Sequence, residues 1–195
     1  MDIINQLDTQ LFLFLNGKHN MFFDPIMYWF SDKLIWIPMY FLLAFFIVRK
    51  YKVNGLIMLL FIGVLIAMCD QTASGLIKNA VQRLRPSHEP ALKGLVHLSK
   101  AGAGGMYGFV SSHAANAFGL CTFLFFVLDD NFKILKYWLI VWAILVSYSR
   151  IYNGVHYPSD VIVASIIGVL YGWLIALLYG KIIQIKDKQK VEHKN

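Results

Sequence analysis

Long uncharged stretches occupy most of the chain, and short polar segments separate them. The five longest stretches cover residues 34–48, 53–69, 114–128, 137–149 and 161–180. A helix needs about 20 mostly apolar residues to cross about 30 Å of hydrocarbon. Three of the stretches can be lengthened, through residues 25–31 before the first, past Asp70 to Ile77 after the second, and by Ile134 and Leu135 before the fourth. The pattern predicts an all-α fold, a polytopic membrane bundle of about five to six transmembrane helices.

The N-terminal segment differs from these spans. Residues 3–15 are apolar but short, and the segment carries Asp2 and Asp8, which is typical of a helix that lies in the membrane interface. It lacks the basic start and the small-residue cleavage site of a signal peptide, so we expect the first span to act as an uncleaved anchor. We expect a single domain over residues 1–195, with an interfacial segment (1–32), a helical bundle (33–183) and a basic cytoplasmic tail (184–195).

Composition supports the membrane assignment. Of the 195 residues, 58% are hydrophobic and 15% are charged, whereas a soluble domain carries about 25% charged residues. With a mean hydropathy of +0.57, the chain does not fit a soluble, disordered, collagen-like or coiled-coil protein. Cys69 and Cys121 both lie in apolar stretches, which is typical of small buried side chains rather than of a disulfide framework or a metal site.

Positive charge sets the expected orientation. The net charge is +7, but the basic residues flank the spans, so we expect no nucleic acid partner. Three groups of Lys and Arg lie between spans one and two, between spans three and four, and after span five. Five spans place all three groups on one side, and the positive-inside rule makes that side cytoplasmic. Residues 79–112 and 151–158 then lie outside, where they form a second basic cluster.

The first candidate site lies where the second span leaves the membrane. Lys78 and Arg85 are seven residues apart, so a continuing helix puts them on one face, and Pro86 then ends the helix. Two cations on one face can bind an anion, with arginine acting through its planar fork. The alternative is that both side chains simply reach from a span end toward the interface.

The second candidate site, Ser111, Ser112 and His113, opens the third span. Serine is a preferred N-cap, and the free backbone N–H groups at a helix start favour a phosphate. The alternative is a plain serine cap beside an interfacial histidine. The preceding stretch has glycines at positions 102, 104, 105 and 108, which we interpret as a flexible loop rather than a phosphate cradle.

The third candidate site joins the ends of spans four and five. Arg150 closes the fourth span, and His156 lies four residues before Asp160. Pro158 suits the first turn of the fifth span. The carboxylate can hydrogen-bond one imidazole nitrogen and leave the other free as a nucleophile, although a local capping pair would have the same spacing. All three sites lie on the predicted outer side, which favours phosphate chemistry over three unrelated structural roles.

Together the three sites resemble the motifs of the type-2 phosphatidic acid phosphatase (PAP2) superfamily, whose site is similar to that of vanadium haloperoxidases. The motif region covers about residues 70–165. The motif P-S-G-H is matched by Ser111 and His113, while Val110 and Ser112 depart from it. The other two motifs, K-x6-R-P and S-R-x5-H-x3-D, are matched in full by Lys78, Arg85, Pro86, Ser149, Arg150, His156 and Asp160.

The resemblance implies a role for each of these residues. His156 would be the nucleophile that forms a phosphohistidine, Asp160 would fix its tautomer, and His113 would protonate the leaving oxygen. No metal and no cofactor would be needed, because side-chain cations would take the place of a divalent ion. The phosphoryl oxygens would be bound by Lys78, Arg85, Ser111, Ser112 and Arg150, with Ser149 as a further candidate.

Asp70 lies inside a predicted span, where a carboxylate costs about 2.5–3.5 kcal/mol unless it faces protein or water. On a regular helix it would lie about 80° around the axis from Lys78. Two interpretations are open. Asp70 is either a partner for Lys78 or Arg150, or a structural contact with Asn116 or another span, which we favour because structural pairs are common.

The expected function is removal of a phosphate from a membrane lipid at the periplasmic face of a bacterial inner membrane. The lipid bilayer is the expected partner, and the candidate substrates are undecaprenyl diphosphate, a lipid A phosphate, phosphatidylglycerol phosphate and phosphatidic acid. A lipid or anion transporter and a catalytically inactive membrane scaffold are the alternatives. The sequence lacks the repeated halves typical of transporters, and a scaffold would not need both His113 and His156.

Overall fold

The computed structural model describes residues 3–192, with side chains through Lys186, and its regular structure is helical. A π-helical segment, Gln71–Ile77, joins α4 to α5. The all-α class predicted from the sequence is confirmed. The α-helices are α1 (Ile3–Asn16), α2 (Phe23–Ser31), α3 (Ile37–Tyr51), α4 (Val53–Asp70), α5 (Lys78–Val81), α6 (Ser112–Val127), α7 (Lys133–Tyr152) and α8 (Pro158–Glu192).

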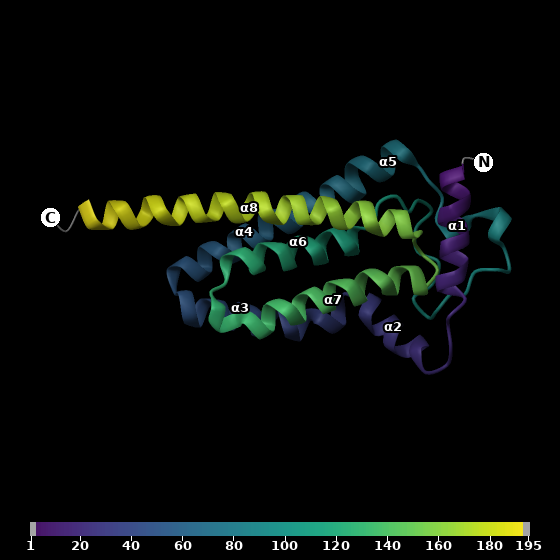
Figure 1. Cartoon of the computed structure of the whole chain (residues 1–195), viewed down its shortest axis with the longest axis horizontal. Helices are drawn as coiled ribbons and strands as arrows, with labels where there is room; N and C mark the ends of the chain where they lie inside the picture. The colour runs from purple at the N-terminus through teal and green to yellow at the C-terminus, as the bar shows by residue number, and fades with distance from the viewer. Residues whose placement is uncertain (1–2, 193–195) are drawn as a thin grey trace.

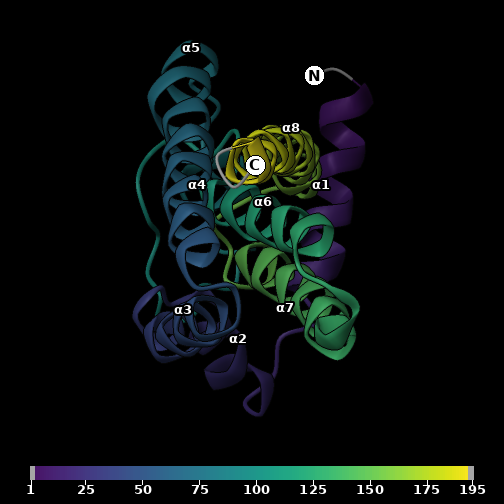
Figure 2. The same ribbon diagram turned by 90° about the vertical axis from the view of Figure 1, so that its left-hand side faces the viewer.

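Four stretches of helix are long and apolar enough to cross a membrane: Leu34–Tyr51, Val53–Val81, Asp130–Tyr152 and Pro158–Lys186. They coincide with four of the five predicted spans. The remaining span corresponds to α6, which has 16 residues and a length of about 24 Å. It packs against α4, α7 and α8, as the end-on view in Figure 2 shows. The predicted multi-pass membrane bundle is confirmed.

The first span does not extend backward. Residues 25–31 belong to the separate helix α2, and Asp32 after it adopts an extended conformation (ψ 123°). Asp32 Oδ1 accepts a hydrogen bond from the Leu34 N–H at 2.9 Å and so starts the next helical turn independently. The suggested extension through residues 25–31 is therefore wrong.

The last helix is longer than the predicted span. α8 runs from Pro158 to Glu192, so the expected boundary between bundle and tail, at residues 183 and 184, falls inside a helix. The end of the predicted basic tail, residues 193–195, lies outside the described residues, as does Asp2 of the N-terminal segment.

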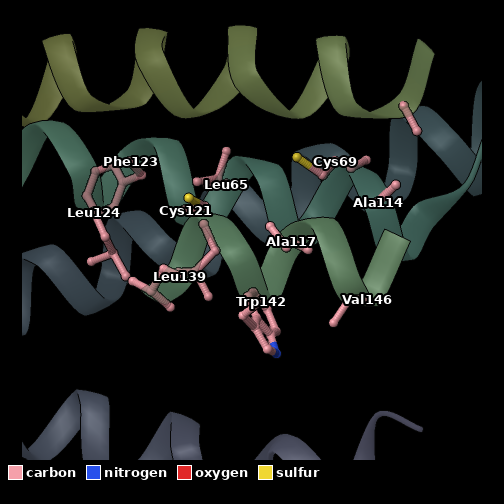
Figure 3. Packing of buried hydrophobic residues seen from close by; sticks show 14 of the residues in the cluster. Leu65, Cys69, Ala114, Ala117, Cys121, Phe123, Leu124, Leu139, Trp142 and Val146 are labelled. Carbon is pink, nitrogen blue, oxygen red and sulfur yellow. The ribbon is translucent and has the colours of Figure 1, made fainter. Parts of the chain in front are cut away.

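Small residues let α6 and α8 approach each other closely. A Cβ atom on Gly168 would lie 2.3 Å from the Ala115 carbonyl oxygen, and one on Gly172 would lie 2.5 Å from the Gly119 carbonyl oxygen. Such close backbone contact is typical of helices in a membrane, where the hydrophobic effect does not hold them together. Larger side chains fill the rest of the buried cluster, as Figure 3 shows for Leu65, Phe123, Leu139 and Trp142.

The N-terminal helix α1 lies across one end of the bundle, at a steep angle to the long helices (Figure 1). Its buried face carries Asp8, Phe12 and Asn16. The Asn16 side chain donates to the carbonyl oxygens of Tyr152 at 2.8 Å and of His97 at 3.0 Å. These bonds attach α1 to the end of α7 and to the loop between α5 and α6. The interfacial placement of this segment stays a prediction.

Candidate active site

Four helix ends meet at one end of the bundle. The C-terminal ends of α5 and α7 lie there beside the N-terminal ends of α6 and α8, and α1 lies across the same end (Figure 1). All three candidate sites from the sequence are therefore at one place. The residues that gather there are Lys78, Arg85, Ser111, Ser112, His113, Arg150, His156 and Asp160.

His156 and Asp160 form a buried pair. His156 comes from the turn between α7 and α8, and Asp160 from the first turn of α8, so His156 Nδ1 lies 3.3 Å from Asp160 Oδ2. The same carboxylate oxygen accepts the Tyr157 backbone N–H at 2.9 Å. The side chains of His156 and Asp160 are 1% and 0% exposed. The carboxylate favours the imidazole tautomer with its hydrogen on Nδ1, which leaves the Nε2 lone pair free.

Burial keeps the His156 imidazole neutral. It lowers the pKa of His156 well below the ordinary value of 6.5, and the positive charges of Arg150, Arg85 and Lys78 lower it further. These three cations come from α7, from a loop and from α5, yet they act on one ring. A neutral imidazole among cations can attack the phosphorus of an anion that those cations bind.

The start of α6 is tied directly to this pair. Ser111 is the N-cap of α6, and its backbone N–H donates to the Asp160 carbonyl oxygen at 3.1 Å. The Ser111 hydroxyl does not cap the helix, and it is buried without a hydrogen-bond partner among residues 3–192. A buried polar group without a partner costs about 1–3 kcal/mol. An oxygen of a bound phosphate would remove that cost.

Lys78 reaches the start of α6 from the neighbouring span. Its ammonium donates to Ser112 Oγ at 3.2 Å, and Ser112 Oγ lies 2.7 Å from Ser74 Oγ. Ser74 belongs to the π-helical segment, which changes the angular register of the helix before Lys78. The angle of about 80° expected between Asp70 and Lys78 on a regular helix therefore does not apply.

The helix that carries Lys78 ends earlier than expected. α5 stops at Val81, and Gln82 adopts a left-handed conformation (φ 50°). Leu84 then pairs with Tyr107 in an isolated antiparallel β-bridge, and Arg85 is extended (ψ 156°). The expected continuous helix from Lys78 to Pro86 is wrong, and Arg85 reaches the site from a loop.

The glycine-rich stretch holds the Arg85 side chain. Arg85 Nε donates to the Tyr107 carbonyl oxygen at 3.1 Å, and the Arg85 backbone N–H donates to the Met106 carbonyl oxygen at 3.0 Å. A Cβ atom on Gly104 would lie 2.7 Å from Arg85 Nη1, and one on Gly108 would lie 3.1 Å from Arg85 Cγ. Glycine at these two positions leaves room for the arginine. The stretch is a loop, as predicted, and it contacts Arg85; its flexibility stays a prediction.

Arg150 links the site to the N-terminal part of the chain. Its carbonyl oxygen accepts the His156 N–H at 3.2 Å, and its guanidinium donates to the hydroxyl of Ser31 at the end of α2. Arg150 Nε is buried with no partner in the described part of the chain, so it can bind a ligand oxygen. Ser149 is different, because its hydroxyl donates to the Val146 carbonyl oxygen at 2.7 Å and so faces its own helix.

A cavity of about 590 Å³ opens beside His113. Asp70 and Asn116 also line it, so Asp70 faces a cavity rather than lipid. Asn116 Oδ1 has no hydrogen-bond partner within residues 3–192, and both interpretations of Asp70 stay open. The apolar part of the lining includes Phe30, Trp36, Tyr40, Leu43, Leu120 and Trp142.

Two residues outside the motif pattern also reach the site. Arg83 forms ion pairs with Asp160 at 3.1 Å and with Asp8 at 2.8 Å. Asp8 lies on α1, 75 residues away from Arg83 along the chain. The one signal of this contact in the sequence is a single charged residue within an otherwise uncharged helix, since a buried charge requires a partner.

Titratable residues also gather near the loop between α1 and α2. His19, Asp24 and His97 have ligand atoms within 4.8 Å of one another. His97 Nε2 lies 3.2 Å from Asp24 Oδ1, and the rings of His19 and His97 are stacked with centroids 3.8 Å apart and planes 4° apart. The in-plane lone pairs of parallel rings do not converge on one ion. This arrangement therefore does not fit a metal site.

The sequence profile of the PAP2 superfamily matches residues 54–184, which include all the motif residues. The chain belongs to the PAP2 superfamily. It is 37% identical over 184 residues to a lipid A 4'-phosphatase of Bacteroides thetaiotaomicron. This match covers 93% of this chain and 81% of that protein. It is 32% identical over 180 residues to a lipid A 4'-phosphatase of Porphyromonas gingivalis. This match covers 92% of this chain and 75% of that protein.

Solved structures agree with this assignment. The crystal structure of Aquifex aeolicus LpxE has a TM-score of 0.66 at 26% identity, and the match covers 89% of this chain and 96% of that one. The resemblance to the PAP2 superfamily drawn from the three motifs is confirmed. This PAP2 protein is a multi-pass membrane enzyme that hydrolyses lipid phosphates, and PAP2 phosphatases in general work without a metal ion.

Proposed function

We propose that this PAP2 protein removes a phosphate from lipid A through a phosphohistidine intermediate on His156. One observation carries the mechanism: a neutral and buried imidazole, oriented by Asp160, lies among the charges of Lys78, Arg85 and Arg150. The cations bind and orient the phosphate, and the imidazole attacks it.

The reaction consists of two displacements at phosphorus. In the first, the His156 Nε2 lone pair attacks phosphorus, the bond from phosphorus to the lipid oxygen breaks, and His113 gives that oxygen a proton. In the second, His113 takes a proton from water, the water oxygen attacks phosphorus, and the phosphorus–nitrogen bond breaks. Inorganic phosphate leaves and His156 is neutral again. Asp160 stabilises the positive imidazole between the two steps.

The three cations stabilise the transition state of each step. Charge in phosphoryl transfer spreads over the three equatorial oxygens, so catalysis depends on positioned positive groups. Arg85 is held by backbone carbonyls and Lys78 by Ser112, so these groups are in place before substrate binds. The buried hydroxyl of Ser111 offers a further donor. Side-chain cations thus supply the charge that a divalent ion provides in other phosphatases.

The cavity beside His113 favours a lipid as the substrate. Its mostly apolar lining can accept an acyl chain, while Asp32 and Lys33 also line it and offer polar contacts to a head group. Among the four candidate lipids, lipid A is favoured because two relatives that match most of this chain are named lipid A 4'-phosphatase. We therefore place the 4'-phosphate of lipid A ahead of undecaprenyl diphosphate, phosphatidylglycerol phosphate and phosphatidic acid.

We place the protein in a bacterial inner membrane with the site on the periplasmic side. The basis is the positive-inside rule, since the basic loops lie at the end of the bundle opposite the site. Single cysteines at Lys93 and at Lys190 test this in intact cells with an impermeant thiol reagent, because Cys69 and Cys121 are buried. We expect labelling at position 93 only. Labelling at position 190 only would reverse the orientation.

Phosphate release by the purified protein tests the substrate. The four candidate lipids are compared in the same detergent, with His156→Ala as the control for contaminating phosphatase. We expect the highest kcat/KM with lipid A, with loss of its 4'-phosphate. A higher kcat/KM with one of the other lipids would move the assignment to that lipid. No release from any of them would favour a transporter or an inactive scaffold.

A further inference from the structure

We infer that Arg83 and Asp8 are positioning residues for the catalytic pair, so that the N-terminal helix α1 forms part of the active site. The inference rests on the proposed roles of His156 and Asp160. It names two residues that none of the three motifs specifies.

Arg83 is held by contacts on several sides. Its Nη1 donates to Asp160 Oδ1 at 3.1 Å and to Ser159 Oγ at 2.7 Å, and its Nη2 donates to Asp8 Oδ2 at 2.8 Å. The guanidinium also lies over the Tyr157 ring, 4.0 Å from its centroid. The planar fork of arginine bridges two carboxylates in a fixed geometry, whereas a lysine ammonium acts as a point charge without that fixed geometry.

Asp8 completes the arrangement from α1. Its side chain is 8% exposed, and it accepts hydrogen bonds from the Ser159 backbone N–H at 2.9 Å and from the Ser159 hydroxyl at 2.5 Å. Asp8 therefore satisfies a free N–H group at the start of α8, just before Asp160. A buried carboxylate is costly unless it is paired. The pairing with Arg83 explains why a charged residue occupies the buried face of an otherwise uncharged helix.

Arg83 acts on the oxygen of Asp160 that His156 does not use. Asp160 Oδ2 faces His156 and Oδ1 faces Arg83, so the guanidinium fixes the rotation of the carboxylate. Charge matters as well as geometry. The Arg83 guanidinium and the carboxylates of Asp8 and Asp160 together leave a single net negative charge. This charge faces the His156 imidazole, which becomes positive when it is phosphorylated. Without Asp8, Arg83 would neutralise Asp160 and weaken that stabilisation.

Asp8→Asn tests the inference with a nearly isosteric change. Asp24→Asn is the matched control, because Asp24 lies in the same N-terminal segment but accepts a hydrogen bond from the Tyr152 hydroxyl at 2.7 Å and lies 3.2 Å from His97 Nε2, without contacting Asp160 or Arg83. The rate of phosphoenzyme formation is measured in single turnovers with radiolabelled lipid A, together with KM and Tm. Since Asp8 does not touch the phosphate, Asp8→Asn should lower that rate about 10-fold or more and leave KM unchanged. Asp24→Asn should leave both unchanged.

Arg83→Lys is a second and independent variant. It keeps the charge but loses the fork between Asp8 and Asp160, so we expect the same selective fall in rate, and this variant decides the matter if Asp8→Asn does not fold. A folded Asp8→Asn or Arg83→Lys variant with the wild-type rate, or with a raised KM and an unchanged rate, would overturn the inference. A wild-type protein that releases phosphate without labelling His156 would instead overturn the proposed function.

Discussion

Gly104→Ala should weaken phosphate binding by moving Arg85 while leaving the protein folded. The added Cβ atom would lie 2.7 Å from Arg85 Nη1 and 3.2 Å from Arg85 Cζ. Real Cβ atoms do not approach within 3.0 Å of such an atom, so the guanidinium must move. The atoms in the way are the end of a flexible side chain, so this movement costs the fold little.

Gly102→Ala is the matched control. Both glycines have a positive φ, 74° at Gly102 and 69° at Gly104, so alanine introduces a similar backbone strain of about 1–3 kcal/mol at either place. A Cβ atom on Gly102 would meet nothing within 4 Å. A hydrogen bond to a charged group contributes about 1.5–3 kcal/mol. Displacing Arg85 from one phosphoryl oxygen should therefore lower kcat/KM roughly 10- to 150-fold.

Initial rates of phosphate release in detergent, with Tm measured on the same samples, separate strain from displacement of Arg85. We expect the same fall in Tm for both variants, because both introduce the same strain. We expect a large fall in kcat/KM for Gly104→Ala alone. Equal losses of activity in the two variants would refute the reasoning, since loop strain rather than the place of Arg85 would then explain them.

Three further predictions concern the site. The pKa of His156 lies below its ordinary 6.5, so the imidazole stays unprotonated as the pH falls from about 8 to 6.5. Single-turnover phosphoenzyme formation from 4-nitrophenyl phosphate should therefore not fall over that range. A steady fall in rate across it would contradict this. Phosphate release should survive EDTA and be inhibited by vanadate, because side-chain cations bind the phosphoryl group; dependence on added Mg²⁺ would count against this. His113→Ala should slow phosphate release from lipid A by about 10²–10⁴-fold. It should slow release from 4-nitrophenyl phosphate much less, because that leaving group needs no proton. Equal losses with the two substrates would contradict the role of His113 as the general acid.

Features that depend on local spacing could be predicted from the sequence. The pairing of His156 with Asp160 is an example, because four residues across a helix start bring the two side chains together whatever the rest of the chain does. The spans could be predicted for a similar reason. Each helix in lipid must satisfy its own backbone hydrogen bonds over a fixed thickness, so an apolar run defines it without knowledge of its neighbours.

Features that depend on contacts between distant segments could not be predicted. α5 ends at Val81 rather than at Pro86. The segment that follows is held by the loop, where the Gly108 N–H donates to the Arg83 carbonyl oxygen at 2.9 Å. The π-helical segment before Lys78 likewise leaves no periodic signature. The contact of Arg83 with Asp8 joins residues 75 positions apart. The carboxylate in α1 indicates that a partner is needed, but the sequence does not show which residue it is.

Rapid-quench trapping of the phosphoenzyme with radiolabelled lipid A tests the central claim most directly. The wild-type protein should give an acid-labile and base-stable adduct on His156, formed before phosphate is released. His156→Ala should give no adduct, and Asp160→Asn should keep the fold but form much less, because an amide can stabilise the wrong imidazole tautomer. An adduct that persists in His156→Ala would contradict the assignment of the nucleophile, and phosphate release by the wild-type protein without any adduct would contradict the covalent mechanism.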